Sequence, residues 1–428
     1  MLWTITGVLG ATILSGAVLG AALGLTGFMI LSIYGGNATQ RGMEAVWNIL
    51  NSFTLTSVPL FILLGDVLVV SGLSRGVYQA MAPLFSRLSG GLLHTNIAVC
   101  TLFGAVSGSS MSVAAAVGSV AYPELRDRGY QRGIVVGTLA AGGTLGLLIP
   151  PSLSLLIYGA LTDTSIGKLF IAGILPGLMM AALFMIVVFW SAHRDPTIAP
   201  EGGPKVPLLE AFLELRKIWP LLTMIFAVLG SLFAGIATPT EAAAVGVAAA
   251  VVMGVTKGTL TPRQMLEALI STSKTFGVVA VVFIGAVILA QGIQLIGLPQ
   301  DILKVVSAWG ISKYAMLIVI VIMYLILGCF FDGLSMMIMT LPIVFPLMIS
   351  LGFDPIWLGV VITIMIEIGM LTPPVGMNLF VLTGITRGEV PLGEAARASA
   401  PFWVMMLVGT VILTIFPSIA TWLPTYIR

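Results

Sequence analysis

Apolar stretches long enough to cross a bilayer recur along the whole of this 428-residue chain. A helical span needs about 20 predominantly apolar residues. The chain is 58% hydrophobic and 8% charged, whereas a soluble domain carries about 25% charged residues. The sequence therefore predicts an all-α polytopic membrane protein whose main contact is membrane lipid. The net charge of +2 gives no reason to expect a nucleic-acid partner.

Two apolar segments are interrupted by a double proline in the same way. "GLLIPPSLSLLIYG" begins at residue 146, and "GMLTPPVGMNLFVLTG" begins at residue 369. Proline donates no backbone hydrogen bond and breaks a helix. We therefore expect two broken helices, over residues 133–160 and 357–386.

Each broken helix follows an apolar segment with a small polar tip. The tips are "LFGAVSGSSMSV" (102–113) and "ILGCFFDGLSMM" (326–337). Because such sequences are poor in the middle of a helix, they predict helical hairpins over residues 92–122 and 314–350. We expect each hairpin to enter and leave the membrane on one side, although the alternative of two full spans per hairpin stays open.

These features repeat at a nearly constant offset. Gly65 matches Gly285, Gly146 matches Gly369, and Pro176 matches Pro401, with offsets of 220 to 225 residues. Such internal similarity indicates a duplication. We infer a first repeat at 1–192, a linker at 193–218 and a second repeat at 219–428.

Each repeat should contain two short spans, a third span, a link, a hairpin, a broken span and a last span. The expected unbroken spans are 3–16, 20–35, 50–72 and 166–192 in the first repeat, and 219–235, 239–255, 276–297 and 400–423 in the second. This gives about 10 transmembrane helices plus two re-entrant hairpins. The links, 74–88 and 301–309, are expected to form amphipathic helices in the membrane interface, with an ordinary loop as the alternative.

Five full spans per repeat place the second repeat upside down relative to the first. With both termini on one side, 14 of the 19 Lys and Arg residues fall on the opposite side. The remaining five are Arg41, Lys168, Lys304, Lys313 and Arg428. Since cytoplasmic loops are enriched in Lys and Arg, the termini are predicted to lie outside. The first hairpin then enters from the cytoplasm and the second from outside. The opening sequence lacks a basic segment, so we interpret it as a retained span, not a signal peptide.

Broken helices expose carbonyls at one half-helix end and N–H groups at the next half-helix start. The carbonyls can bind a cation, and the N–H groups attract an anion. Inverted repeats with discontinuous helices are typical of secondary transporters. The prolines are therefore interpreted as holding open two related binding sites, with packing kinks as the alternative.

Few ionisable residues fall within the spans: Asp66, Glu241, Asp332 and Glu367. Glu241, in "TPTEAA", is expected to cap its own helix. Carbonyl and hydroxyl oxygens at the breaks suit a hard cation such as Na⁺ better than a proton relay. Asn378 could bind an anionic substrate or satisfy a kink. The chain has no Walker A sequence and no nucleophile–base pair, so an enzyme is not expected.

At several motifs the chain resembles the large, DctM-like membrane subunit of tripartite ATP-independent periplasmic (TRAP) transporters. The motifs are "VPLFILLGD", "FGAVSGSS", "GTLGLLIPPS", "LFIAGILPG", "TPTEAAAVG" and "EIGMLTPPVGMNLFV". The resemblance implies a bacterial inner-membrane importer, and the distribution of Lys and Arg then predicts that both termini are periplasmic. Its implied partners are a small four-span membrane subunit and a periplasmic substrate-binding protein. It also implies uptake of a small organic anion driven by two or more co-transported Na⁺, with a transport domain that moves as an elevator against a scaffold domain.

The resemblance also implies where the ligands bind. The first Na⁺ site would involve Gly104, Ser107, Gly146, Ile149 and Pro151, and the second Gly328, Gly369, Thr372 and Val375. The substrate would lie near Ser109, Ser110, Asp332, Gly333, Ser335 and Asn378. A stand-alone Na⁺/dicarboxylate symporter remains the alternative within transport, and a passive channel or an intramembrane scaffold remains the alternative outside it.

Overall fold

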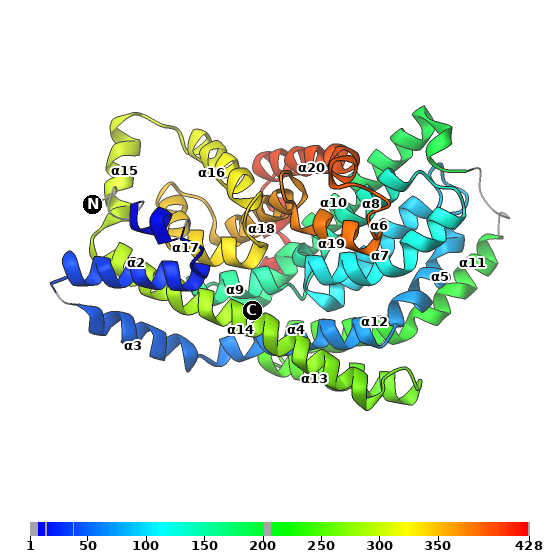
Figure 1. Ribbon diagram of the computed structural model, residues 1–428, viewed down its shortest axis with the longest axis horizontal. Coiled ribbons are helices and arrows are strands. Elements are labelled where there is room, and N and C mark those ends of the chain that lie inside the picture. The colour runs from blue at the N-terminus through cyan, green and yellow to red at the C-terminus, as the bar shows by residue number, and fades with distance from the viewer. Residues whose placement is uncertain (1–6, 13–14, 37, 201–206, 427–428) are drawn as a thin grey trace.

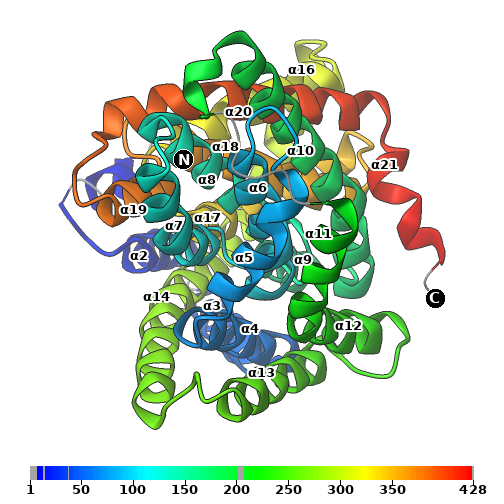
Figure 2. The same cartoon turned by 90° about the vertical axis from the view of Figure 1, so that its right-hand side faces the viewer.

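The structure is a computed structural model that describes residues 7–12, 15–36, 38–200 and 207–426. Every regular element in these ranges is a helix. Two layers are visible from both directions (Figures 1 and 2). The lower layer holds α3, α4, α12, α13 and α14, and the upper layer holds the hairpins and the broken helices. The all-α membrane fold predicted from the sequence is therefore confirmed.

The helices of the two repeats occur in the same order. The first repeat contains α2 (Leu19–Ile33), α3 (Thr39–Leu50), α4 (Phe53–Val70), α5 (Leu73–Phe85), α6 (Leu92–Ser107), α7 (Ser110–Asp127), α8 (Arg132–Leu148), α9 (Leu153–Thr162) and α10 (Ile166–Arg194). The second contains α12 (Trp219–Phe233), α13 (Pro239–Thr256), α14 (Pro262–Leu295), α15 (Leu298–Ala308), α16 (Lys313–Gly328), α17 (Gly333–Ser350), α18 (Pro355–Leu371), α19 (Met377–Ile385) and α20 (Leu392–Ile415). Between them lie η1 (Pro196–Ile198), α11 (Leu208–Glu214) and η2 (Leu215–Ile218), and the chain ends with α21 (Ser418–Thr421) and η3 (Leu423–Tyr426).

Several helix boundaries differ from the expected spans. The third span of the second repeat, expected to start at residue 276, begins at Pro262, because Thr261 and Gln264 form a capping box that starts α14 there. The last span starts at Leu392 instead of 400 and ends at Ile415, where Phe416 leaves the helical conformation before Pro417. The expected span 3–16 lies partly outside the described residues, and only 7–12 are described as helical.

The predicted cap at Glu241 is confirmed. The Glu241 carboxylate accepts from the Thr238 N–H at 2.7 Å, and the Glu241 N–H donates back to the Thr238 hydroxyl at 3.3 Å.

The two links between the third span and the hairpin of each repeat are helical, and they form α5 and α15. Within α15 the expected apolar face is divided, since Val306 is buried against the protein whereas Val305 and Trp309 are exposed.

Six helical segments of the described chain are long enough and apolar enough to cross a membrane. A seventh results if Thr39–Leu50 and Leu55–Val70 form one span bent by 51°. Four apolar helices are shorter: Leu19–Ile33, Leu92–Ser107, Lys313–Gly328 and Pro355–Leu371. Three of these belong to hairpins or broken helices, where a turn or a double proline ends them early. The second arm of the second hairpin, α17, is by contrast among the six.

The two repeats exchange equivalent contacts. Helix α2 of the first repeat packs on α14 of the second, and α13 of the second packs on α4 of the first. Likewise α7 packs on α19, and α17 packs on α9. This reciprocity is what two copies related by a pseudo-two-fold axis would show.

Small residues allow the closest of these contacts. A Cβ on Gly27 of α2 would lie 2.5 Å from the backbone nitrogen of Leu289 in α14, and Gly20 and Gly285 are in backbone contact. Close approach at small residues is the usual way that helices associate in a bilayer.

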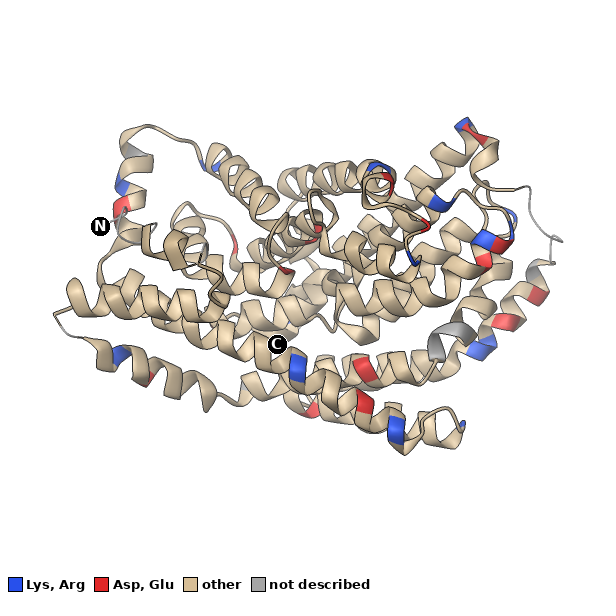
Figure 3. Ribbon diagram, in the orientation of Figure 1, with Lys and Arg blue, Asp and Glu red and all other residues tan. Residues whose placement is uncertain are grey.

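Lys and Arg residues are more frequent toward the end of the molecule that carries α7, α8 and α11 than toward the end that carries α3 and α15 (Figure 3). This asymmetry agrees with the distribution used to orient the chain. The periplasmic location of both termini stays a prediction.

Candidate transport site

The first hairpin meets the first broken helix at two glycines. A Cβ on Gly104 of α6 would lie 2.9 Å from the Cα of Gly146 in α8. Beyond this contact, Ile149 is extended, and Ser152 caps α9 by accepting from the Leu155 N–H at 3.2 Å. The Ser152 hydroxyl also donates to the Leu147 carbonyl.

The tip of this hairpin lies directly on the break. Gly108 adopts the left-handed conformation, with φ 63°, and a Cβ there would lie 2.8 Å from the Pro151 carbonyl. The Leu153 N–H donates to the Gly108 carbonyl at 3.3 Å. The side chain of Ser107 is buried, and its hydroxyl has no hydrogen-bond partner among the described residues. All five residues predicted for the first Na⁺ site therefore lie at this one junction.

The second junction has the same construction. A Cβ on Gly369 of α18 would lie 2.6 Å from the Cα of Gly328 in α16. Thr372 is extended, and its hydroxyl donates to the Gly369 carbonyl at 3.0 Å. The Cys329 thiol donates to the Pro373 carbonyl at 3.0 Å, which ties the hairpin to the break.

The two breaks differ in exposure. Residues 149–152 are buried, whereas Pro373, Pro374 and Val375 are exposed, Val375 to 36%. Gly376 at the start of α19 has φ 55° and offers no side-chain cap, unlike Ser152 at the start of α9. The predicted residues of the second site are thus together, but Val375 lies at the open edge.

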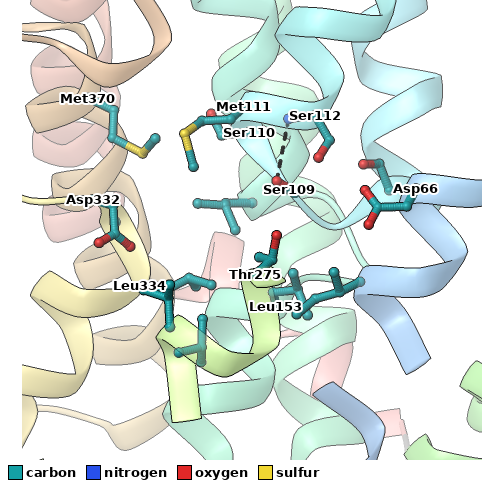
Figure 4. Close-up of a pocket in the computed structure, with 16 residues that line it drawn as sticks. Asp66, Ser109, Ser110, Met111, Ser112, Leu153, Thr275, Asp332, Leu334 and Met370 are labelled. Atoms are coloured by element: carbon teal, nitrogen blue, oxygen red, sulfur yellow. Dashed lines mark hydrogen bonds between the residues drawn. The ribbon is translucent and has the colours of Figure 1, made fainter. Parts of the chain in front are cut away.

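A cavity of about 260 Å³ lies between the two hairpin tips (Figure 4). The upper layer contributes Ser107, Ser109, Ser110, Met111, Ser112, Leu147, Leu153, Asp332, Gly333, Leu334 and Met370. The lower layer contributes Ile62 and Asp66 of α4 and Thr275, Val278 and Val279 of α14. The cavity therefore lies at the boundary between the two layers.

Four of the six predicted substrate residues line this cavity: Ser109, Ser110, Asp332 and Gly333. Ser335 and Asn378 are buried outside its lining. The Ser335 N–H donates to the Asp332 carboxylate at 3.1 Å, so it belongs to the cap of α17.

Asn378 reaches the cavity only through Ser110. Its amide nitrogen donates to the Ser110 hydroxyl at 2.6 Å, and that hydroxyl donates to the Glu367 carboxylate at 2.9 Å. The remaining oxygens, Oε1 of Glu367 and Oδ1 of Asn378, have no partner among the described residues. A buried carboxylate of the second repeat thus positions the hairpin tip of the first.

The sequence interpretation assigned Asp66 and Glu367 to no site, although both were noted as ionisable residues within spans. Asp66 accepts from the Thr272 hydroxyl of α14 at 2.8 Å and also lines the cavity. Their position within apolar segments was the available signal, since such residues are usually functional.

Two layers, paired broken helices and a small cavity between hairpin tips define a multi-pass membrane transporter. The family model "Tripartite ATP-independent periplasmic transporter, DctM component" matches residues 6–419, so the chain belongs to the DctM family of TRAP transporter large subunits. It is a transporter permease and not an enzyme.

Named relatives cover nearly the whole chain. The C4-dicarboxylate TRAP transporter large permease protein DctM of Pseudomonas aeruginosa is 34% identical over 408 residues, which cover 95% of this chain and 94% of that protein. The ectoine/5-hydroxyectoine TRAP transporter large permease protein UehC of Ruegeria pomeroyi is 33% identical and covers 86% of each. The crystal structure of the Alcanivorax borkumensis YdaH transporter shares the fold, with a TM-score of 0.64, 15% identity and coverage of 91% of this chain and 89% of that one.

Proposed function

We propose that this chain is the transport subunit of a Na⁺-coupled secondary importer in the bacterial inner membrane. It takes up a small organic anion, a carboxylate or a sulfonate, that a periplasmic substrate-binding protein delivers. A small four-span membrane subunit completes the complex. The observation that carries this proposal is the pair of equivalent hairpin–break junctions on either side of one cavity.

The oxygen-rich junctions support Na⁺ as the coupling ion. Hard cations prefer carbonyl and hydroxyl ligands. At the first junction the hydroxyl of Ser107, which has no partner among the described residues, is such a group. At the second, Thr372 supplies a hydroxyl beside Gly328 and Gly369. No described cluster of His, Cys, Asp and Glu offers a competing site for a transition metal.

The position of the cavity supports an elevator motion. The lower layer contributes five residues to the cavity lining, Ile62, Asp66, Thr275, Val278 and Val279, whereas the rest of the lining belongs to the hairpins and broken helices. Movement of the upper layer against the lower would carry the hairpin tips, with their ligand, away from these five residues. The links α5 and α15 would act as the arms.

The test is uptake into proteoliposomes that hold this chain with its small membrane subunit. Radiolabelled organic acids are presented on the cognate binding protein, with and without an inward Na⁺ gradient. Uptake that needs both the binding protein and Na⁺ is the expected result. Uptake that needs Na⁺ alone would favour the stand-alone symporter, and flux without Na⁺ would favour a passive channel.

A further inference from the structure

We propose that a small cavity at the end of the lower layer that is predicted to be cytoplasmic binds the phosphate of an anionic phospholipid. The lipid comes from the surrounding bilayer, and its site is separate from the cavity between the hairpin tips. The inference does not depend on the proposed function, because it concerns a contact with the membrane and not the transported ligand.

The cavity has a volume of about 180 Å³ and lies between the start of α5, the start of α12 and the turn that follows α13. Two of its lining residues are lysines from different parts of the chain. Lys217 precedes α12, and Lys257 follows α13. None of the described residues that line the cavity is Asp or Glu. The lining is therefore positively charged.

Local structure holds the two lysines at this cavity. Gly258, with φ 66°, ends α13, and the N–H of Thr259 donates to the Gly254 carbonyl at 2.9 Å. This turn places both Lys257 and Thr259 in the lining. On the other side of the cavity, η2 packs against α5 and carries Lys217.

The two lysines differ in their partners. The Nζ of Lys217 pairs with the Glu214 carboxylate at 2.5 Å, and the two side chains are 66% and 39% exposed. An ion pair this exposed is weak, so it leaves Lys217 able to attract another anion. Lys257 forms no ion pair with another described residue. A phosphate group in the cavity would give it one.

The cavity lies at the level of the lipid headgroups. The candidate membrane span Pro239–Thr256 ends one residue before Lys257. At the start of α12, Trp219 is 58% exposed, and Trp is enriched where a membrane meets water. Along the same two helices, Phe226 and Val252 are exposed to 72% and 60%, which gives acyl chains an apolar surface. Basic pockets between transmembrane helices are suited to anionic headgroups. A soluble phosphate would gain nothing from the apolar surface, so the arrangement favours a lipid.

The cavity also borders the joint between α4 and α5. Ser71 and Gly72 connect these helices, and both residues line the cavity. Gly72 has φ 64°, so the chain changes direction there. A bound headgroup would therefore contact the joint between a helix of the lower layer and the link to the first hairpin.

The experiment measures the melting temperature of the complex of this chain with its small subunit in detergent micelles as phosphatidylglycerol is added. Phosphatidylcholine with the same acyl chains is the comparison, because both lipids carry a phosphate but only phosphatidylglycerol has a net negative charge. Phosphatidylglycerol should raise the melting temperature by about 3 °C more than phosphatidylcholine does. Glycerol 3-phosphate at the same concentration represents a soluble phosphate and should give no rise.

Substitutions locate the effect. Lys257→Gln should increase the phosphatidylglycerol concentration needed for half of the rise by about fivefold. Lys217→Gln should act in the same direction, and Lys257→Arg should keep the response of the parent. Lys274→Gln is the matched control, because it removes an exposed lysine that is predicted for the same side of the membrane but lies outside this cavity.

Three results would each overturn the lipid site. The first is an equal response of the parent to the two lipids. The second is a response to phosphatidylglycerol that is the same in Lys257→Gln as in Lys274→Gln, because the lipid would then be attracted by charge in general. The third is a rise with glycerol 3-phosphate as large as that with phosphatidylglycerol, which would indicate a site for a soluble phosphate.

Discussion

Gly328 of the second hairpin and Gly369 of the second broken helix are in direct backbone contact, so that a Cβ on Gly369 would lie 2.6 Å from the Cα of Gly328. Gly104 and Gly146 make the equivalent contact in the first repeat, at 2.9 Å. Each contact lies about one turn before the polar tip of the hairpin and the double proline of the broken helix. The glycine pair therefore sets how closely each tip approaches its break.

Gly369→Ala should weaken both the fold and Na⁺-dependent uptake. The added methyl group has no space against the backbone of Gly328, and overpacking of this kind costs typically about 1–3 kcal/mol. Thermal unfolding of the complex and uptake in proteoliposomes provide the two readings. Gly384→Ala in α19 is the matched control, because nothing lies within 4 Å of its added Cβ. Equal behaviour of the two variants would contradict the close approach at Gly369.

Ser110→Ala should disconnect the first hairpin tip from the second broken helix. The hydroxyl joins Glu367 to Asn378, and its loss leaves buried polar atoms without partners, at a cost of about 1–3 kcal/mol. A lower melting temperature and slower uptake are expected. Ser119→Ala in the same helix removes only a bond to the Ala116 carbonyl and should change little. A Ser110 variant as stable and active as the parent would exclude a role for this network.

Ser107→Ala and Thr372→Ala should each reduce the stabilisation of the complex by Na⁺. Each removes one hydroxyl oxygen from a proposed cation site, and a loss of about 1 kcal/mol corresponds to about a fivefold higher Na⁺ requirement. Melting temperatures measured against Na⁺ concentration, with K⁺ holding the ionic strength constant, give the shift. Thr383→Ala is the control, since its hydroxyl bonds only within α19. If the melting temperature depends on Na⁺ concentration in the same way in the parent, Ser107→Ala and Thr372→Ala, these hydroxyls do not belong to the cation sites.

Glu389→Gln should flatten the acid side of the stability profile. Glu389 lies between α19 and α20, where its carboxylate accepts from the Tyr122 hydroxyl at 2.9 Å and pairs with Arg126 at 3.0 Å. The Tyr122 hydrogen bond, followed by the charges of Arg126 and Arg132, lowers the pKa of Glu389 below its ordinary value of 4.5. A lowered pKa stabilises the fold above that ordinary value, and this contribution is lost as the pH falls through the lowered pKa.

The measurement is melting temperature against pH from about 3 to 6. The parent should lose more stability toward the acid end than the Glu389 variant does. Glu210→Gln, on the exposed linker helix α11, controls for the removal of one carboxylate. Parallel profiles for the parent and Glu389→Gln would show that the contact adds no pH dependence.

The sequence predicted those helix ends, hairpin tips and caps that are determined by residues adjacent in the chain. Proline pairs end α8 and α18, glycine and serine at 108–109 and Asp332 make the hairpin tips, and the Thr238–Glu241 box starts α13. These features act through neighbours in the chain, so they can be recognised without the fold.

What the sequence did not predict depends on contacts between the repeats. Ser110 meets Glu367 across 257 residues, and Asp66 meets Thr272 across 206. The pattern of apolar and polar residues along the chain does not indicate which residues of the two repeats contact each other. The early start of α14 was also missed, since the helix continues through the polar stretch "STSKT", in which Thr272 is buried and donates to Asp66 of the other repeat.

The central claim is that two equivalent cation sites drive uptake, and the most direct measurement is the initial uptake rate against external Na⁺ concentration. The assay uses the complete complex in proteoliposomes, with a saturating loaded binding protein. Two coupled sites predict a sigmoidal dependence with a Hill coefficient between one and about two, and no uptake in K⁺ alone. An uptake rate that does not change with Na⁺ would contradict the claim.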